Sequence, residues 1–159
     1  MRVALMTVVQ IPRTLFDAIF TAAGQAKPRE AGGVLMGNHV GSAGSRRVTE
    51  LVDGGPDASA TRTSFNPDQQ FQQSEVDKLF AKHDGNIEYL GDWHSHPGGV
   101  PYPSATDRGA LKRIRAALDA RCAEPIMLIC GGRLRRTMHA FGLTPDGLDV
   151  REVSIVLID

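Results

Sequence analysis

The chain has 159 residues, the size of one ordinary domain, and we expect residues 1–159 to form a single domain. Its 18 basic and 18 acidic residues cancel, so the net charge gives no sign of a nucleic-acid partner. No apolar segment approaches the roughly 20 residues of a membrane span. The two cysteines, Cys122 and Cys130, form no CxxC pair, which favours reduced thiols in a cytoplasmic protein.

The first half of the chain alternates apolar runs with segments in which apolar residues recur at helical spacing. In chain order, the predicted elements are a strand at 3–11, a helix at 13–25, strands at 32–40 and 46–52 around a turn at 41–45, and a helix from Pro67 towards His83. Asn66 is expected to cap this last helix. Its expected inner face consists of Phe71, Val76, Leu79 and Phe80.

The second half is richer in predicted strands. These are a strand at 87–96, a helix at 104–121, and strands at 124–130, 134–143 and 148–158, the last two joined by a turn at 145–147. This order predicts an α/β or α+β sheet flanked by helices. The irregular segment 53–65 is a candidate border of a substrate site. Three arginines, Arg133, Arg135 and Arg136, alternate imperfectly along one predicted strand and favour a solvated face over a binding patch.

Two histidines on one predicted strand form the centre of a candidate metal site. His94 and His96 are two residues apart, and residues at that spacing project from the same face of a strand. With Asp107 they supply three ligands and leave a fourth position open, which is the ligand count of a catalytic zinc site. Alternating histidines alone are more often surface or packing residues. The coincidence with Pro97, Ser104 and Asp107 favours a metal site.

The residues around these ligands have simpler expected positions. Ser95 should face away from the histidines, in step with Ile87 and Tyr89 on the packed side of the strand. Ser104 and Asp107 also have the spacing of a helix capping box. Ser104 can accept a hydrogen bond in the cap and still donate outward, while Asp107 can place one oxygen on zinc and the other on a backbone N–H.

The sequence resembles the JAMM (MPN+) zinc metalloprotease family. Its signature is an upstream Glu, then His-Ser/Thr-His-Pro, seven residues, Ser, two residues and Asp. These positions are filled here by Glu30, His94, Ser95, His96, Pro97, Ser104 and Asp107. The resemblance covers most of the chain and implies a cytidine-deaminase-like α/β fold, a mixed β-sheet flanked by helices, with isopeptidase activity toward ubiquitin-like conjugates.

Within that family, segment 88–97 looks most like the bacterial stand-alone members. The likeness implies an anti-phage operon that also encodes E1-like and E2-like enzymes as partners. It further implies that zinc lowers the pKa of a bound water towards about 7. Glu30 would take the water's proton and return it to the departing lysine amine. Ser104 would stabilise the oxyanion of the tetrahedral intermediate.

Three other functions are weighed against this one. A zinc peptidase acting on small peptides would share the chemistry and differ only in its groove. A non-catalytic MPN-type scaffold is the second possibility, and the intact ligand set argues against it. A zinc nucleobase deaminase requires His-x-Glu followed by Pro-Cys-x-x-Cys, and Cys122 and Cys130 have the wrong spacing for that role.

Overall fold

The computed structural model describes residues 7–41, 44–117, 121–122 and 124–159. Its elements, in chain order, are β1 (Val8–Pro12), α1 (Arg13–Ala26), β2 (Gly32–His39), β3 (Arg46–Asp53), β4 (Ser59–Ala60), β5 (Phe65–Asn66), α2 (Gln69–Lys82), β6 (Glu88–Ser95), α3 (Ala105–Ala116), β7 (Ile126–Gly131), β8 (Thr137–Leu143) and β9 (Val150–Ile158). Parts of the predicted 3–11 strand, 41–45 turn and 104–121 helix lie outside the described residues.

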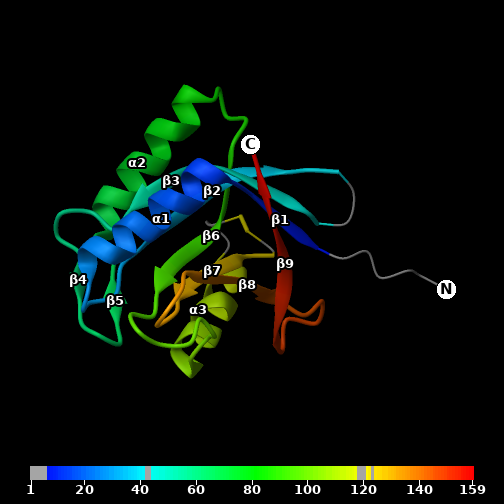
Figure 1. Ribbon diagram of the computed structural model, residues 1–159. Coiled ribbons are helices and arrows are strands. Elements are labelled where there is room, and N and C mark those ends of the chain that lie inside the picture. Colours follow the sequence, from blue (N-terminus) through cyan, green and yellow to red (C-terminus); the bar gives the residue numbers. More distant parts are fainter. Residues whose placement is uncertain (1–6, 42–43, 118–120, 123) are drawn as a thin grey trace.

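Seven strands close into a barrel in the order β1-β3-β2-β6-β7-β8-β9 (Figure 1). The circle closes through β1, which pairs in parallel with β9 along its whole length and with β3 only at Val9 and Gln10. The pair β6–β7 is also parallel, whereas the other neighbours are antiparallel. The predicted mixed sheet with helices is therefore confirmed, and its closure is an additional finding.

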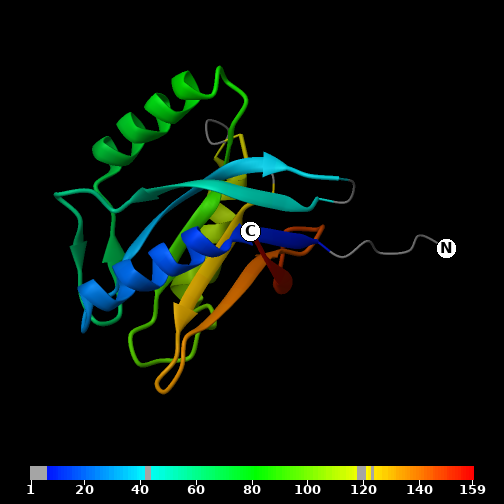
Figure 2. The ribbon, with the colours of Figure 1, turned by 45° about the horizontal axis from the view of Figure 1, so that its top comes forward.

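The helices cover both faces of this sheet, as the alternation of buried residues along the strands requires. In β2, Leu35 faces the core under α1, whereas Val34 and Met36 pack with α2. In β7, Met127 and Ile129 pack beside Leu111 of α3, and their neighbours in sequence face α1. Figure 2 shows α2 and α1 on opposite sides of β2 and β3. The face shared by α2 and α3 is the one from which the candidate ligand His94 projects.

The second helix begins later than predicted. Asp68, not Asn66, is its N-cap, and the Asp68 carboxylate accepts the N–H of Phe71 at 3.1 Å. Asn66 is already paired in the β4–β5 hairpin, so it cannot cap the helix. Phe80 is 41% exposed, contrary to its predicted inner position. It follows Leu79, and consecutive helical residues are about 100° apart around the axis, so both cannot face the sheet.

Other boundaries agree with the predicted elements to within a few residues, with two exceptions. The helix α3 ends at Ala116 because Ala117 has an extended backbone, so it is shorter than the predicted 104–121. The segment 53–65, predicted to be irregular, contains most of the short β4–β5 hairpin. No helix in the part of the chain that the structure describes is long and apolar enough to cross a membrane.

A bulge interrupts β6 where it pairs with β2. Leu35 lies opposite Gly91 whereas Met36 lies opposite Tyr89, so Leu90 has no partner of its own. Gly91 has a φ of 142°, and a Cβ on it would lie 1.8 Å from a carbonyl oxygen of β7. The bulge therefore requires glycine at position 91.

This bulge changes the face to which Ile87 and the first residues of β6 point. Ile87 and Tyr89 pack with α2, and the Tyr89 hydroxyl donates to Asp92 Oδ1 at 2.9 Å. They therefore share the face of Asp92 and His94. The prediction that Ser95 is in step with Ile87 and Tyr89 is wrong, because strict alternation holds only after the bulge.

Candidate metal centre

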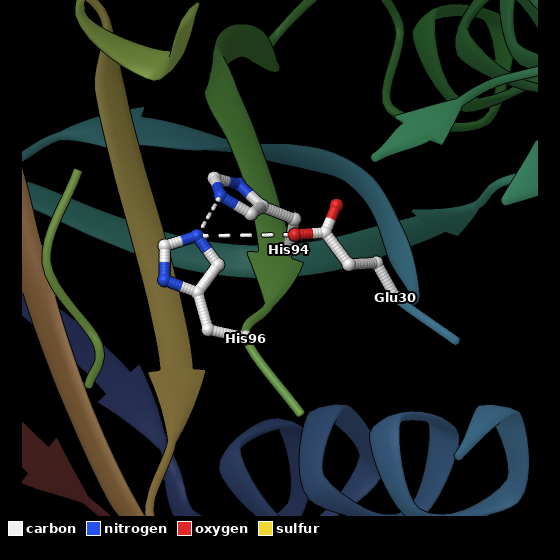
Figure 3. Close-up of side chains that lie close together, drawn as sticks. All are labelled: Glu30, His94 and His96. Carbon is white, nitrogen blue, oxygen red and sulfur yellow. Dashed lines mark hydrogen bonds and ion pairs between the residues drawn. The ribbon is translucent and has the colours of Figure 1, made fainter. Parts of the chain in front are cut away.

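The end of β6 carries the two histidines. His94 is paired with Gly32 of β2 and Ile129 of β7, near the middle of the sheet. His96 follows the last residue of the strand, and its N–H donates to the carbonyl of Cys130 at 2.8 Å. The two Nε2 atoms lie 3.0 Å apart (Figure 3), so the structure brings the rings together as their spacing predicts.

The first turn of α3 brings Asp107 to the same place. The Ser104 hydroxyl accepts the N–H of Asp107 at 3.1 Å, and Asp107 Oδ2 accepts the N–H of Ser104 at 2.9 Å, which completes a capping box. The same Oδ2 lies 3.3 Å from Nε2 of His94 and of His96. One oxygen therefore serves both roles, whereas the sequence predicted one oxygen for each.

These three donor atoms form a triangle with sides of 3.0, 3.3 and 3.3 Å. Tetrahedral ligands at about 2.0–2.1 Å from a zinc ion would lie about 3.3 Å from one another. The carbonyl of Val100 accepts from His96 Nδ1 at 2.9 Å, so in the neutral imidazole that nitrogen carries the proton and the Nε2 lone pair is free to bind a metal. The spacing and the donor chemistry of the triangle therefore fit a divalent zinc-like ion.

Glu30 reaches the site from the segment that precedes β2. Its carboxylate is buried, with Oε1 3.9 Å from His96 Nε2 (Figure 3). Glu30, His94 and His96 offer donor atoms that all lie within 4.8 Å of one another. The distance from Glu30 to His96 exceeds every side of the triangle. Glu30 is therefore better placed to face the open coordination position than to act as a ligand.

Hydrogen bonds hold the backbone around Glu30 from two sides. The N–H of Glu30 donates to the carbonyl of Thr61, beside β4, at 2.8 Å. The N–H of Ala31 donates to Ser95 Oγ at 2.8 Å, and the N–H of Ser95 donates back to the Ala31 carbonyl at 2.9 Å. Ser95 is 3% exposed and thus ties the Glu30 segment to the strand of the histidines. The sequence predicted only that Ser95 faces away from the metal ligands.

The surroundings shift the pKa values of the two carboxyl groups of the site in opposite directions. Burial raises the pKa of Glu30, and the nearby His94 and His96 lower it by less, so it lies above its usual value. Burial also raises the pKa of Asp107, but hydrogen bonds from the two histidines outweigh it and hold that pKa far below its usual range. Asp107 is thus kept ionised, as a metal ligand must be, while Glu30 is suited to exchanging a proton.

A third carboxyl group, Asp92, lies on the histidine face and was missed in the sequence. Burial raises its pKa to about 6, against the smaller effects of the Tyr89 hydrogen bond and of His94. The Tyr89–Asp92 contact exists only because the bulge puts residues three apart on one face. A pattern that assumes alternation along the whole strand cannot reveal it.

Two clefts open beside the site, each next to one of its residues. One is a cavity of about 460 Å³ that contains Glu30 and is bordered by β4, by Phe65 of β5 and by Trp93. We call it the tail cleft. The basic cleft, a cavity of about 370 Å³, contains His96 and is bordered by the hairpin between β7 and β8. A polypeptide crossing the metal centre could occupy both.

Comparison with known proteins identifies relatives over most of the chain. The family described as prokaryotic homologs of the JAB domain matches residues 12–141, a range that includes every residue of the candidate site. The probable metalloprotease y4qB of Sinorhizobium fredii is 36% identical over 135 residues, which are 84% of this chain and 82% of that protein. The CD-NTase/cGAS isopeptidase of Enterobacter hormaechei is 33% identical over 129 residues, 81% of this chain and 69% of its own.

The fold is also similar to that of a solved structure. The solution structure of protein DSY2949 from Desulfitobacterium hafniense aligns with a TM-score of 0.70 and 26% identity. The alignment covers 95% of this chain and 93% of the other. The similarity therefore extends over nearly the whole arrangement of helices and strands.

Proposed function

The chain belongs to the prokaryotic homologues of the JAB domain and is a metalloprotease, and from this premise we propose that it is a zinc isopeptidase that cleaves after the C-terminal tail of a ubiquitin-like protein or a similar conjugate. The observation that carries the proposal is the triangle of His94, His96 and Asp107 donor atoms with the Glu30 carboxylate beside it. The name of the Enterobacter relative supports an isopeptide bond as the substrate.

The proposed mechanism gives each residue of the site one task. His94, His96 and Asp107 would hold the zinc ion, which when bound acidifies water and polarises a carbonyl group. Glu30 accepts the proton of the attacking water and transfers it to the departing amine. Its raised pKa favours both transfers, because a group that must accept and release a proton works best when its pKa is near the working pH.

Ser104 has a separate proposed task. Its hydroxyl oxygen accepts a hydrogen bond in the cap of α3, and a hydroxyl that accepts one bond still has a proton to donate. That proton is proposed to stabilise the negative charge that develops on the carbonyl oxygen of the substrate. Loss of one such donor typically costs about 10²–10³ in rate.

The tail cleft is the proposed site of the extended tail. A Cβ on Gly32 would lie 2.6 Å from the ring of Phe65, so the β4–β5 hairpin closes directly onto the start of β2 beside Glu30. An extended chain could lie along this hairpin as an additional strand. We place the enzyme, as residues 1–159 of one catalytic domain, in the bacterial cytoplasm beside E1-like and E2-like partners of an anti-phage system.

The decisive experiment compares two kinds of substrate. The purified chain is incubated with a lysine isopeptide conjugate of a glycine-ended ubiquitin-like protein and with short free peptides, each with and without a chelator, and zinc is measured by atomic emission. The proposal expects chelator-sensitive cleavage of the conjugate. Cleavage of free peptides alone would instead identify a small-peptide protease. Absence of both zinc and cleavage would identify a scaffold.

A further inference from the structure

The basic cleft concentrates charge in a chain that is neutral as a whole. Four cationic side chains line it, and none of its lining residues is Asp or Glu. These four are Lys27, Arg133, Arg135 and Arg136. The sequence suggested that the three arginines form a solvated face, because periodicity cannot distinguish open solvent from the wall of a cleft.

This cleft is connected to the metal centre by the backbone. The N–H of Gly99 donates to the His96 carbonyl at 3.0 Å, and the N–H of Gly132 donates to the Gly99 carbonyl at 3.1 Å. The N–H of His96 donates to Cys130, as described above. The loop after His96 and the hairpin that carries the arginines therefore form one hydrogen-bonded unit, so a ligand in the cleft would lie close to the reacting bond.

The last turns of α1 separate the basic cleft from the tail cleft. The α1 side chains that line the basic cleft are those of Phe20 and Ala23, with Gly24 and the following Lys27. Those lining the tail cleft belong to Ala22, Gln25 and Ala26, with the following Arg29. At 3.6 residues per turn these sets lie on opposite sides of the helix axis. The clefts thus leave the metal centre in different directions.

The charges in the basic cleft differ in how far they are already neutralised. Arg136 pairs with Asp17 at 3.3 Å and lies over the ring of Phe20 at 5.3 Å, which holds it as part of the wall. Lys27, Arg133 and Arg135 make no ion pair with any residue in the described ranges. These three are therefore more available than Arg136 to an incoming carboxylate.

We propose that the basic cleft binds an acidic segment of the substrate polypeptide, on the side of the scissile bond opposite the tail. The assignment of the two sides rests on the proposed function. A polypeptide fits better than a nucleic acid, because the cations are confined to one cleft of about 370 Å³ and the chain has no basic excess to follow a phosphate backbone. Leu134, 99% exposed on the same hairpin, adds an apolar contact suited to a peptide.

The test measures binding rather than cleavage, so it does not depend on catalysis. The 159-residue Glu30→Gln chain with zinc added is titrated, by fluorescence anisotropy, into a labelled peptide rich in Asp and Glu and into its Asn and Gln counterpart. We expect the acidic peptide to bind about tenfold more tightly, with a difference that shrinks as salt is raised. The double variant Arg133→Glu, Arg135→Glu should remove that preference.

A matched control has the same change in net charge outside both clefts. The variant Arg47→Glu, Lys78→Glu reverses two exposed cations and should keep the preference for the acidic peptide. Three results would each overturn the proposal. The first is equal binding of the two peptides, and the second is an equal loss of the acidic-peptide preference in this control. The third is tighter binding of a single-stranded oligonucleotide that displaces the peptide. Charge-dependent binding by the Glu30→Gln protein, together with a failure of the unsubstituted protein to cleave any conjugate, would count against the proposed function and would still support the basic cleft.

Discussion

Glu30 and Asp107 carry the same chemical group in different surroundings, which is why we propose different roles for them. Asp107 lies 3.3 Å from both imidazoles and is fixed by the cap of α3, whereas Glu30 is buried and farther from His96. We expect Glu30→Gln to keep its zinc and to lose about 10²–10⁴ in turnover, because the triangle of ligands is intact but no carboxylate can carry the proton. Zinc analysis and single-turnover rates check this. Asp107→Asn, the comparison variant, should lose zinc and turnover together, and a Glu30→Gln enzyme that cleaves at the normal rate would refute the assignment.

We expect Ser95 to be a positioning residue, because it is hydrogen-bonded to the backbone of Ala31, next to Glu30, and not to Glu30 itself. In Ser95→Ala a buried N–H loses its acceptor, which should cost roughly 1–3 kcal/mol of unfolding free energy. We expect kcat to fall as well, with unchanged zinc content and a shifted pH–rate profile, because the Glu30 carboxylate is no longer held in place. Ser95→Thr keeps the oxygen and should restore both kcat and the profile. If the alanine variant lost stability but kept its pH–rate profile, the role of Ser95 would be packing alone.

At the scale of the element, the bulge of β6 places Tyr89 on the same face of the sheet as Asp92 and His94. It therefore permits the Tyr89–Asp92 hydrogen bond beside the histidine. Gly91→Ala would put a Cβ 1.8 Å from the carbonyl of a neighbouring strand at a φ of 142°, and we expect a loss of roughly 3 kcal/mol in unfolding free energy. Gly85 is the matched control. It also has a positive φ but has no atom near its Cβ, so Gly85→Ala should cost only about 1 kcal/mol. Urea unfolding measures both, and equal losses would show that the close approach is unimportant.

The same element shows what could be predicted from the sequence. Spacing along β6 and the start of α3 predicted that His94, His96 and Asp107 come together, because strand and cap geometry are local. The bulge was missed, because it depends on a φ that only the tertiary pairing selects. The bond between Ser95 and Ala31 joins residues 64 apart, which no local pattern specifies. Only resemblance to a family, and no spacing, placed Glu30 at the site.

For the whole molecule, the opposite pKa shifts of His96 and Asp107 make the free energy of unfolding depend on pH and on metal binding. The hydrogen bond that the Asp107 carboxylate accepts from His96 raises the pKa of His96 against a smaller effect of burial, while the pKa of Asp107 is lowered. A raised histidine pKa stabilises the folded state below its unfolded value of about 6.5, and that stability is lost as the pH rises through the folded pKa. A lowered aspartate pKa stabilises the folded state above the unfolded pKa of about 3.9, and that stability is lost as the pH falls through the folded pKa. The pair therefore contributes most to the metal-free protein between about pH 4 and 6.5.

Zinc should reverse this dependence, because a histidine must be neutral to bind a metal. We expect the melting temperature of chelator-treated protein to fall between about pH 6 and 8, relative to Asp107→Asn, which lacks the pair. The rise in melting temperature on adding zinc should grow over the same range, since fewer protons compete for His96. Scanning calorimetry at fixed zinc concentration measures both. A zinc-induced rise that shrank with increasing pH would mean that protons and metal do not compete at His96, and the triangle would then not be the metal site.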